Sequence, residues 1–480
     1  MLTISEIKQF IDEDRTSKKK QQARKGVDYY EARHDIKDYK IYYVNEKGDL
    51  IEDTTRSNIK ISHPFFTELI DQCAQYMLSG DDYIVKSDIP ELQTELNKYF
   101  DDEFKMELND LITYTKIEGD SFLYRYVDEE FRTRFKFADG LNVVEVPAKY
   151  SSDKEDYVIY HYVDKKEKEK VIIKIQVWDS KQVHYYKMID DTISLDDDVK
   201  MNPKPHVIYE EEKEKYYDTF GDVPFLRLDN NRKRTSDLYV IKDLIDDYDL
   251  MACGLSNNLQ DVAEGIYVVK GWDGQELDTL INDIKVKKQV SVGEGGDLDI
   301  KTIQVPYQAR VAKMEQDEKN IYRFGMGLNT SLIGEGNATN YILKSRYALL
   351  EMKCKKLESY LKKLMKKVIK IVLDEINKNN DKDYKYSDTW VEFKREVMTN
   401  ALDNAQIEQV NAQTEQVRIN TLLALASVLD QDTVLKEICN VLDIEYEKIK
   451  DKIPKQITPE EELINANTEL NNIMTGDSVE

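Results

Sequence analysis

Two glycine-rich stretches are the segments of this 480-residue chain whose composition most invites a phosphate-binding interpretation. They occupy residues 293–296 and 325–336. Neither contains the GxxxxGK[ST] pattern, in which backbone amides and a lysine hold the phosphates, and neither lies between a predicted strand and a predicted helix. We therefore expect no nucleotide site in either stretch.

The other residue types that carry out chemistry are scattered along the sequence. The histidines lack HxxxH and HExxH spacing and are expected on the surface or in strands. They are His34, His63, His161, His184 and His206. The acidic groups at 190–191 and 196–198 have enough charge for Mg²⁺, but they fall in a predicted hairpin loop, which favours a solvated charge run.

The thiols and hydroxyls give no stronger signal. The four cysteines are far apart and form no CxxC pair, which predicts neither a zinc site nor a disulfide framework. They are Cys73, Cys253, Cys354 and Cys439. No serine or cysteine nucleophile stands beside a credible base. The sequence therefore predicts no catalytic residue, no metal and no cofactor, and we do not expect an enzyme.

The charge balance restricts the partners. With 69 basic and 93 acidic residues the net charge is −24, whereas a free-standing nucleic-acid binder is usually basic. We expect a protein that does not grip nucleic acid but that a duplex can slide past. The lysine-rich segment from Tyr341 to Lys370 reverses this balance locally. It can be a solvated helix face, a contact with the acidic surface of a neighbouring subunit, or a DNA contact, and the acidity elsewhere favours the neighbour.

Length and hydropathy set the broad class. The chain is long enough for roughly three domains. Its first residues are charged and contain no signal-peptide core, and no apolar run approaches the ~20 residues of a membrane helix. We expect a soluble protein that is assembled in a reducing, intracellular compartment.

The helix predicted within residues 230–263 organises the chain. Its apolar residues follow one another at steps of three and four, which is a heptad-like stripe that needs partner helices along its length. The stripe consists of Leu238, Ile241, Ile245, Tyr248, Ala252, Leu255, Leu259 and Val262. Thr235 and Ser236 are candidate N-caps, and the aspartates from Asp243 to Asp261 are expected on water-facing sides.

Helices and then strands precede this stripe. Helices are predicted over residues 1–28, 64–78 and 90–115, with a hairpin turn at 45–48. From Phe122 to Leu228 the apolar period changes to two, which predicts an antiparallel meander.

A small insertion and further helices follow it. Residues 264–306 are expected to form one compact unit, with strands at 266–269, 289–292 and 298–305 and a helix at 275–286. A helix should return over 308–324 and lead into the small, polar segment 325–340. We then expect a long helix over 341–377 with an apolar seam, a strand at 390–397, and helices from 400 to 452. The seam comprises Leu350, Leu357, Leu361, Leu364, Val368 and Ile371.

Several segments, in this order, resemble the portal proteins of tailed double-stranded-DNA bacteriophages, in the branch common in phages of Gram-positive hosts. They include Tyr29-Tyr30 with His34-Asp35-Ile36, QCAQYMLSG at 72–80, EGDSFLYRY at 118–126, NIYRFG at 320–325 and Val305-Pro306. The most specific piece is PFLRLDNNRKRTSDLYVIKDLIDDYD at 224–249. The similarity covers most of the chain.

The resemblance implies an α+β portal-type fold and a division into named parts. These are a wing with helices and a β meander (1–229), a stem helix (230–263), a clip (264–306), a stem return helix (307–324), a tunnel loop (325–340), a long wing or spine helix with a strand (341–399), and a helical crown with the C-terminal tail (400–480).

The resemblance also implies a role and partners. It implies a ring of about twelve subunits at the portal vertex of the phage head, assembled in the host cytoplasm, through which double-stranded DNA is packaged and ejected. The partners would be the terminase motor, the head-completion (adaptor) proteins, and the major capsid and scaffolding proteins, with no membrane involved. Since no ATPase motif is present, the driving force must come from the motor.

The same resemblance suggests residues for each task. The loop residues facing DNA would be Asn329, Thr330, Ser331, Leu332, Ile333, Asn337 and Thr339. Stem packing would use Leu238, Ile241, Ile245, Tyr248, Leu255 and Leu259. Docking at the clip would use Trp272, Gln275 and Asp278. A tail or baseplate subunit remains the main alternative, since it would share the acidity and the helical seams, and an enzyme comes third.

Overall fold

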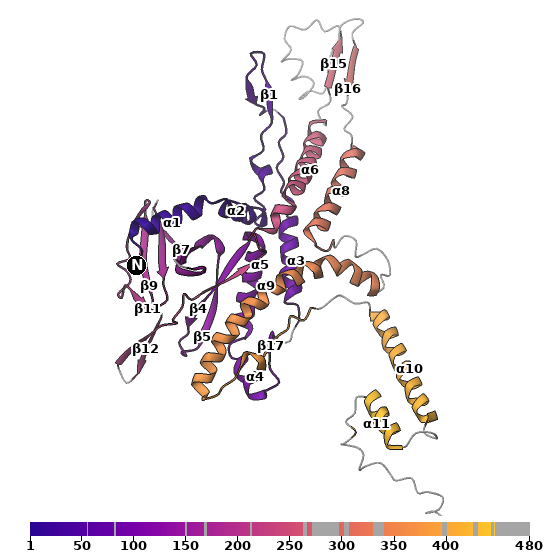
Figure 1. The fold of residues 1–480 in the computed structure, drawn as a ribbon. Coiled ribbons are helices and arrows are strands. Elements are labelled where there is room, and N and C mark those ends of the chain that lie inside the picture. The colour runs from indigo at the N-terminus through magenta and orange to yellow at the C-terminus, as the bar shows by residue number, and fades with distance from the viewer. Residues whose placement is uncertain are drawn as a thin grey trace, which may run out of the picture. The chain divides into compact units, whose positions relative to one another are not determined.

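The computed structural model describes most of the chain (Figure 1). The described residues are 1–54, 56–80, 83–148, 151–167, 170–211, 214–262, 266–270, 297–301, 307–329, 340–395, 401–425, 431–442 and 446. They fold into two compact units. The first holds residues 1–337 and 342–397, and the second holds 338–341 and 398–480. No helix within the described residues is both long and apolar enough to cross a membrane.

Two helices, rather than the single one predicted, begin the chain. They are α1 (Ile4–Thr16) and α2 (Lys18–Tyr30). Ser17 separates them because it adopts an extended conformation and its side chain caps α2 by accepting from the Lys20 amide. The short helix η1 (Asp35–Asp38) and the predicted hairpin of β1 (Tyr42–Val44) and β2 (Leu50–Glu52) follow.

The next helices build the centre of the first unit. The predicted helix at 64–78 is confirmed as α3 (Phe65–Met77). The helix predicted over 90–115 is instead two helices, α4 (Pro90–Leu96) and α5 (Asp102–Glu118). Asp101 starts the second one, because its carboxylate accepts a hydrogen bond from the Phe104 amide.

The period-two region is antiparallel, as predicted, but it is not one meander. The larger sheet has the order β10-β9-β8-β7-β6, with β11 also paired to β9. Its strands are β6 (Val143–Ala148), β7 (Ser151–Glu167), β8 (Lys170–Trp178), β9 (Gln182–Ile189), β10 (Thr192–Leu195) and β11 (Lys204–Pro205). The apolar side of α1 covers this sheet, since Ile7 and Ile11 share a core with Ile159 and Ile175.

A second sheet joins the two ends of the region. Its order is β14-β4-β5, formed by β4 (Asp120–Val127), β5 (Thr133–Ala138) and β14 (Phe225–Asp229). The register places Phe225 opposite Tyr124 and Asp229 opposite Asp120. The paired strands β4 and β14 are about a hundred residues apart in sequence, and local periodicity does not reveal which distant strands pair. This explains why the sequence suggested a simple meander. A separate hairpin pairs β12 (Val207–Glu211) with β13 (Glu214–Asp218).

A helical hairpin follows the second sheet. It comprises the short helix η3 (Asp237–Val240), α6 (Lys242–Val262) and the return helix α8 (Tyr307–Gly325). The helices α6 and α8 lie side by side (Figure 1). Between them, β15 (Ile266–Lys270) pairs with β16 (Asp297–Lys301), in agreement with two of the predicted strands. The predicted helix 275–286 and strand 289–292 lie outside the described residues.

The long helix predicted after residue 340 is confirmed as α9 (Asn340–Asn380). Its seam is buried, and α3, α5 and the second sheet contribute to the same core. The strand predicted over 390–397 is shorter, β17 (Trp390–Val391), and pairs with β3 (Val85–Lys86). The second unit contains α10 (Ala401–Leu425) and α11 (Gln431–Val441), in the region predicted to be helical.

Candidate functional site: the stem and the base of the loop

The base of the helical hairpin is a packed apolar core. Leu238, Ile241 and Ile245 from the predicted stripe are 3%, 1% and 0% exposed. They pack with residues of α2, α3, α5 and α8. These are Tyr29, Phe66, Leu69, Ile70, Ile117, Ile321 and Tyr322. Burial of this kind contributes about 25 cal/mol per Å² of apolar surface, so the lower stripe fixes the hairpin to the body of its own chain.

The apolar side chains of the stripe become more exposed toward the C-terminal end of α6. Tyr248 is half-buried, with its ring 4.8 Å from that of Phe65 in an edge-to-face arrangement. Leu255 is also half-buried, and Leu259 is 58% exposed. The same heptad pattern therefore has a partner in the lower half of the helix and an open apolar edge in the upper half.

Polar contacts hold α6 against α8 along this hairpin. Lys313 of α8 forms ion pairs with Asp247 of α6 and, at 2.5 Å, with Asp317 of its own helix. Gly254 allows a close approach, because a Cβ at that position would lie 2.7 Å from the guanidinium of Arg310. An ion pair between α6 and α8 thus adds to the apolar contacts of the hairpin.

A buried carboxylate joins α6 to the segments around α2 and α3. Asp249 is 0% exposed, and its two oxygens lie 2.6 Å from Nδ1 of His34 and 2.7 Å from Nδ1 of His63. The His63 backbone amide donates a third hydrogen bond at 3.0 Å. Burial by itself raises the pKa of the Asp249 carboxyl, but the hydrogen bonds from the histidines outweigh it and lower that pKa below its usual value.

This cluster corrects two predictions. Asp249 was expected on a water-facing side of the helix, and His34, which is 1% exposed, was expected on the surface or in a strand. The three residues are far apart in sequence, so no local spacing could reveal them. The only available signal was that Asp249 follows Tyr248 of the apolar stripe, close to the buried side of the helix.

The base of the loop at 325–340 is anchored on three helices. The Gln72 side chain of α3 accepts from the Leu328 amide at 2.9 Å and donates to the Leu328 carbonyl at 2.8 Å. Asn329 donates to Glu318 of α8 at 2.9 Å. A Cβ on Gly327 would lie 2.0 Å from Leu69, so only glycine fits there without a shift of the core.

A buried ion cluster that includes Lys353 of α9 also contacts the base of the loop. Lys353 donates to the Gly325 carbonyl at 3.0 Å and lies 3.0 Å from the Asp237 carboxylate, with Lys116 of α5 on the other side at 3.4 Å. Burial opposes ionisation of Asp237, but Lys116 and Lys353 outweigh it and lower its pKa. Asp237 therefore has two roles: it pairs with two buried lysines, and it places a negative charge at the start of a helix.

Only part of the predicted site can be located. Of the loop residues, Asn329 is described, whereas Thr330, Ser331, Leu332, Ile333, Asn337 and Thr339 lie outside the described residues. The clip residues Trp272, Gln275 and Asp278 also lie outside them. Ser236 acts as a cap, as predicted, by accepting from the Leu238 amide at 3.1 Å.

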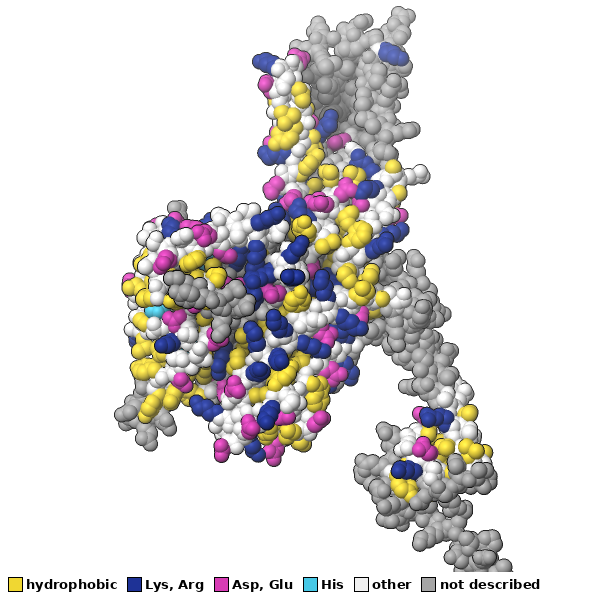
Figure 2. Space-filling view, in the orientation of Figure 1, with side chains coloured by type: hydrophobic (Ala, Val, Ile, Leu, Met, Phe, Trp, Pro, Cys, Tyr) yellow, Lys and Arg dark blue, Asp and Glu magenta, His cyan; other side chains and the backbone are white. Residues whose placement is uncertain are grey.

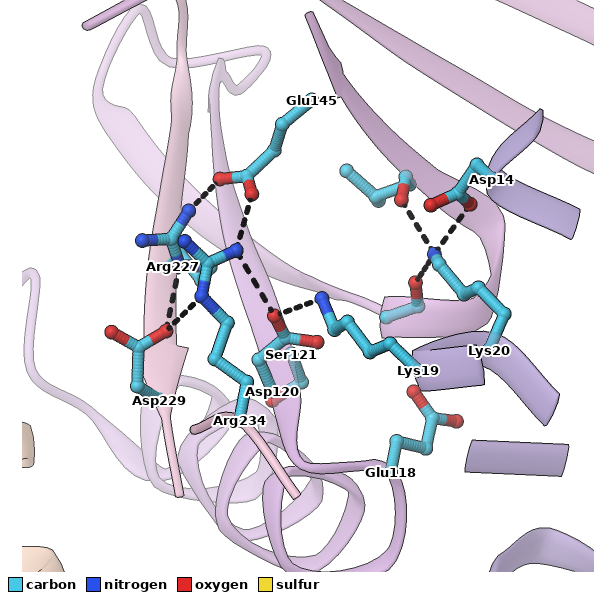
Figure 3. Close-up of polar contacts among 12 residues, drawn as sticks. Asp14, Lys19, Lys20, Glu118, Asp120, Ser121, Glu145, Arg227, Asp229 and Arg234 are labelled. Atoms are coloured by element: carbon cyan, nitrogen blue, oxygen red, sulfur yellow. Dashed lines mark hydrogen bonds and ion pairs between the residues drawn. The ribbon is translucent and has the colours of Figure 1, made fainter. Parts of the chain in front are cut away.

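The most specific sequence segments meet in a polar network at the edges of the two sheets (Figure 3). Glu145 of β6 lies between the guanidinium groups of Arg227 and Arg234, the latter at 2.9 Å. Asp120 of β4 pairs with Lys19 of α2 at 2.5 Å and with Arg234 at 3.7 Å. The segments 118–126 and 224–249 are thus joined to each other and to β6 by this network.

The remaining acidic and sulfur groups take structural roles. Asp196, predicted as part of a solvated run, is 4% exposed and pairs with Lys174 of β8 at 2.7 Å. The thiols of Cys73 and Cys354 lie 3.5 Å apart in the core between α3 and α9. Among the described residues, no group of three His, Cys, Asp or Glu side chains is arranged to hold a metal ion.

Comparison with known proteins adds two relatives with assigned names. Both are called "Portal protein", one from Bacillus phage SPP1 and one from Clostridium phage phiCD119. The first is 26% identical over 332 residues, covering 68% of this chain and 65% of the relative, which is just under two thirds of its length. The second is 27% identical over 406 residues, covering 78% of this chain and 85% of the relative.

A solved structure described as "Neck of empty GTA particle computed with C6 symmetry" matches more loosely. One of its chains has 13% identity and a TM-score of 0.38, over 80% of this chain and 90% of that chain. A superposition this loose does not establish a shared fold. The family model "Phage portal protein, SPP1 Gp6-like" matches residues 9–454, which is nearly the whole sequence. The matched range includes all the labelled residues of the polar network in Figure 3. The chain therefore belongs to the SPP1 Gp6-like family of phage portal proteins.

Proposed function

We propose that this protein forms a closed ring of about twelve subunits at the portal vertex of a phage head, and that double-stranded DNA is packaged and ejected through its central channel. The observation that carries the proposal is membership of the portal family over residues 9–454. Assembly in the host cytoplasm, before the ring is built into the virion, belongs to the same proposal.

The stem supports ring formation through its uncovered apolar edge. A heptad stripe that is buried at Ile245 and open at Leu259 lacks part of the partner surface that its pattern demands. In a ring, the hairpin of an adjacent subunit would supply it. Stem residues 230–263 and 307–324 would then line the channel.

The loop at 325–340 is proposed to face the moving duplex. The first end of the loop is fixed by Gln72 and Lys353, which would keep that end in place during translocation. The polar, mostly uncharged residues that we assign to this contact can touch DNA without a fixed ionic grip. They are Asn329, Thr330, Ser331, Leu332, Ile333, Asn337 and Thr339.

The clip, residues 264–306, is proposed as the docking site for other proteins. It would receive the terminase motor first and the head-completion proteins later, with Trp272, Gln275 and Asp278 as contact residues. The wing and the crown would meet the major capsid and scaffolding proteins. A tail or baseplate subunit is the alternative, and it need not form a closed ring.

The stem edge gives a direct test of this proposal. Leu259→Asp places a charge on the exposed apolar edge and should prevent ring formation, or require far more protein for it, without unfolding the chain. Leu195→Asp is the matched control, because Leu195 is similarly exposed at 53% but lies in β10 of the larger sheet. Native mass spectrometry would measure the subunit count. Rings that form equally well with either substitution would contradict the proposed role of the stem edge.

A further inference from the structure

The outer face of α9 is strongly basic. The helix buries its apolar seam in the core, and seven lysines lie on the opposite side, all exposed. They are Lys355, Lys356, Lys362, Lys363, Lys366, Lys367 and Lys370. Figure 2 shows dark blue side chains gathered where Figure 1 draws α9 across the body of the first unit. This face is unusual in a chain whose net charge is −24.

Several of these charges are not balanced within the subunit. Lys355 and Lys362 pair with Glu351 and Glu358 of the same helix, at 3.5 and 2.7 Å. Within the part of the chain that the structure describes, no ion pair is formed by four others, which span ~21 Å along the helix. These are Lys356, Lys363, Lys367 and Lys370. Four like charges on one face repel one another, so an external acidic surface would stabilise them.

A complementary acidic surface lies on α5. Asp102, Met106 and Asp110 recur at steps of four and are all exposed, Met106 by 71%. Neither aspartate forms an ion pair with a described residue. Partial dehydration by neighbouring groups raises the pKa of Asp110, as expected for a carboxylate that lacks a cation.

The acidic surface is also hollowed. The three residues border a depression of about 500 Å³. Its other lining residues are Gln75, Leu78, Lys105 and Asn109. Leu78 and Met106 give this depression apolar surface beside its two carboxylates. Such a surface suits lysine, which buries its methylenes while its ammonium reaches a charge.

We propose that the lysine face of α9 docks into this acidic hollow on α5 of the next subunit in the ring. The proposal rests on the proposed ring and identifies a pair of surfaces within it. Both helices bury their apolar faces in the same core, so the two charged surfaces face outward on different patches. One copy can then use both patches at once, which a head-to-tail ring requires.

The spacing of the charges fits such a contact. Asp102 and Asp110 are eight residues apart, or ~12 Å along a helix, and Lys363 and Lys370 are seven residues apart, or ~10.5 Å. Lys363 lies beside Lys362 on the same face and has no ion pair among the described residues. Two ammonium groups can therefore reach the two carboxylates across helices that run alongside each other.

Charge reversal tests the contact. Lys363→Glu combined with Lys370→Glu, and separately Asp102→Lys combined with Asp110→Lys, should each raise the protein concentration needed for rings by roughly tenfold in 50 mM salt, as measured by native mass spectrometry. The chain carrying all four changes restores opposite charges and should form rings within about threefold of the original concentration.

A matched variant controls for net charge. Lys181→Glu combined with Lys200→Glu reverses two exposed lysines in turns of the larger sheet and should leave ring formation unchanged. Single-surface variants that assemble like this control would overturn the docking proposal while leaving the portal ring intact. Normal rings that instead retain duplex DNA less well would assign the lysine face to DNA and also overturn the proposal. Failure of the unaltered protein to form rings would refute the proposed function itself.

Discussion

Replacing Asp249 with asparagine tests the attachment of helix α6 to the segments around α2 and α3. The carboxylate accepts hydrogen bonds from both His34 and His63 and also from the His63 amide. Asparagine preserves the size of the side chain but has one acceptor oxygen and an NH₂ group. At least one histidine nitrogen would then face a donor instead of an acceptor, inside a site where the native side chain is 0% exposed.

The expected cost follows from the kinds of interaction that are lost. A hydrogen bond to a charged group contributes about 1.5–3 kcal/mol, and breaking a buried charged pair by removing one partner costs about 3–5 kcal/mol. The three bonds share one carboxylate and are not additive. We therefore expect Asp249→Asn to lower the free energy of unfolding by about 3 kcal/mol, roughly a hundredfold in the unfolding equilibrium.

Urea unfolding followed by tryptophan fluorescence and circular dichroism at pH 7 would measure this difference, at one fixed protein concentration because assembly also stabilises the fold. Asp243→Asn is the control, since Asp243 lies in the first turn of the same helix, is exposed, and should cost less than about 1 kcal/mol. Equal losses from both substitutions, or a loss below about 1 kcal/mol for Asp249→Asn, would refute the structural role of the cluster.

Three further outcomes are expected. Because the pKa of Asp249 is lowered in the folded state, its carboxylate stabilises the fold above the usual carboxyl pKa near 4, and this contribution is lost as the pH falls further. A series of urea unfolding curves from pH 6 to 3 should therefore show a steeper decline in stability for the native protein than for Asp249→Asn. Parallel declines would contradict this expectation. Gly327→Ala should cost about 1–3 kcal/mol because its Cβ meets Leu69, and Leu69→Ala should relieve part of that cost; strictly additive losses would argue against the contact. Lys353→Met should lower the free energy of unfolding by about 3–5 kcal/mol, as measured by thermal unfolding, because it removes one partner of a buried ion pair. Lys356→Met, at an exposed position, should change that free energy by under about 0.5 kcal/mol. Equal effects of the two substitutions would contradict the buried ion cluster.

Local periodicity predicted the helices that carry one continuous apolar seam. The seams of α6 and α9 repeat at helical steps over many residues, and both helices are present close to the predicted ends. The sequence did not predict two places where one helix ends and the next begins, because a single capping residue marks each of them. Ser17 and Asp101 each provide a single side-chain hydrogen bond to a helix start, which is too weak a pattern to distinguish from an uninterrupted helix.

Long-range pairings could not be predicted from spacing alone. The strand β14 returns to β4 instead of continuing a meander, and His34, His63 and Asp249 come from three separate parts of the chain. The segments that carry the family resemblance include His34, Asp249 and most of the two strands, since 34–36, 118–126 and 224–249 are among them, but they do not include His63.

Negative-stain electron microscopy of the purified, unaltered protein, with native mass spectrometry for the subunit count, tests the central claim most directly. A portal ring predicts end-on views of closed rings with a central hole, and masses near twelve copies of the 56.2 kDa chain. Filaments or compact dimers without a hole would contradict the channel and favour a tail or baseplate subunit.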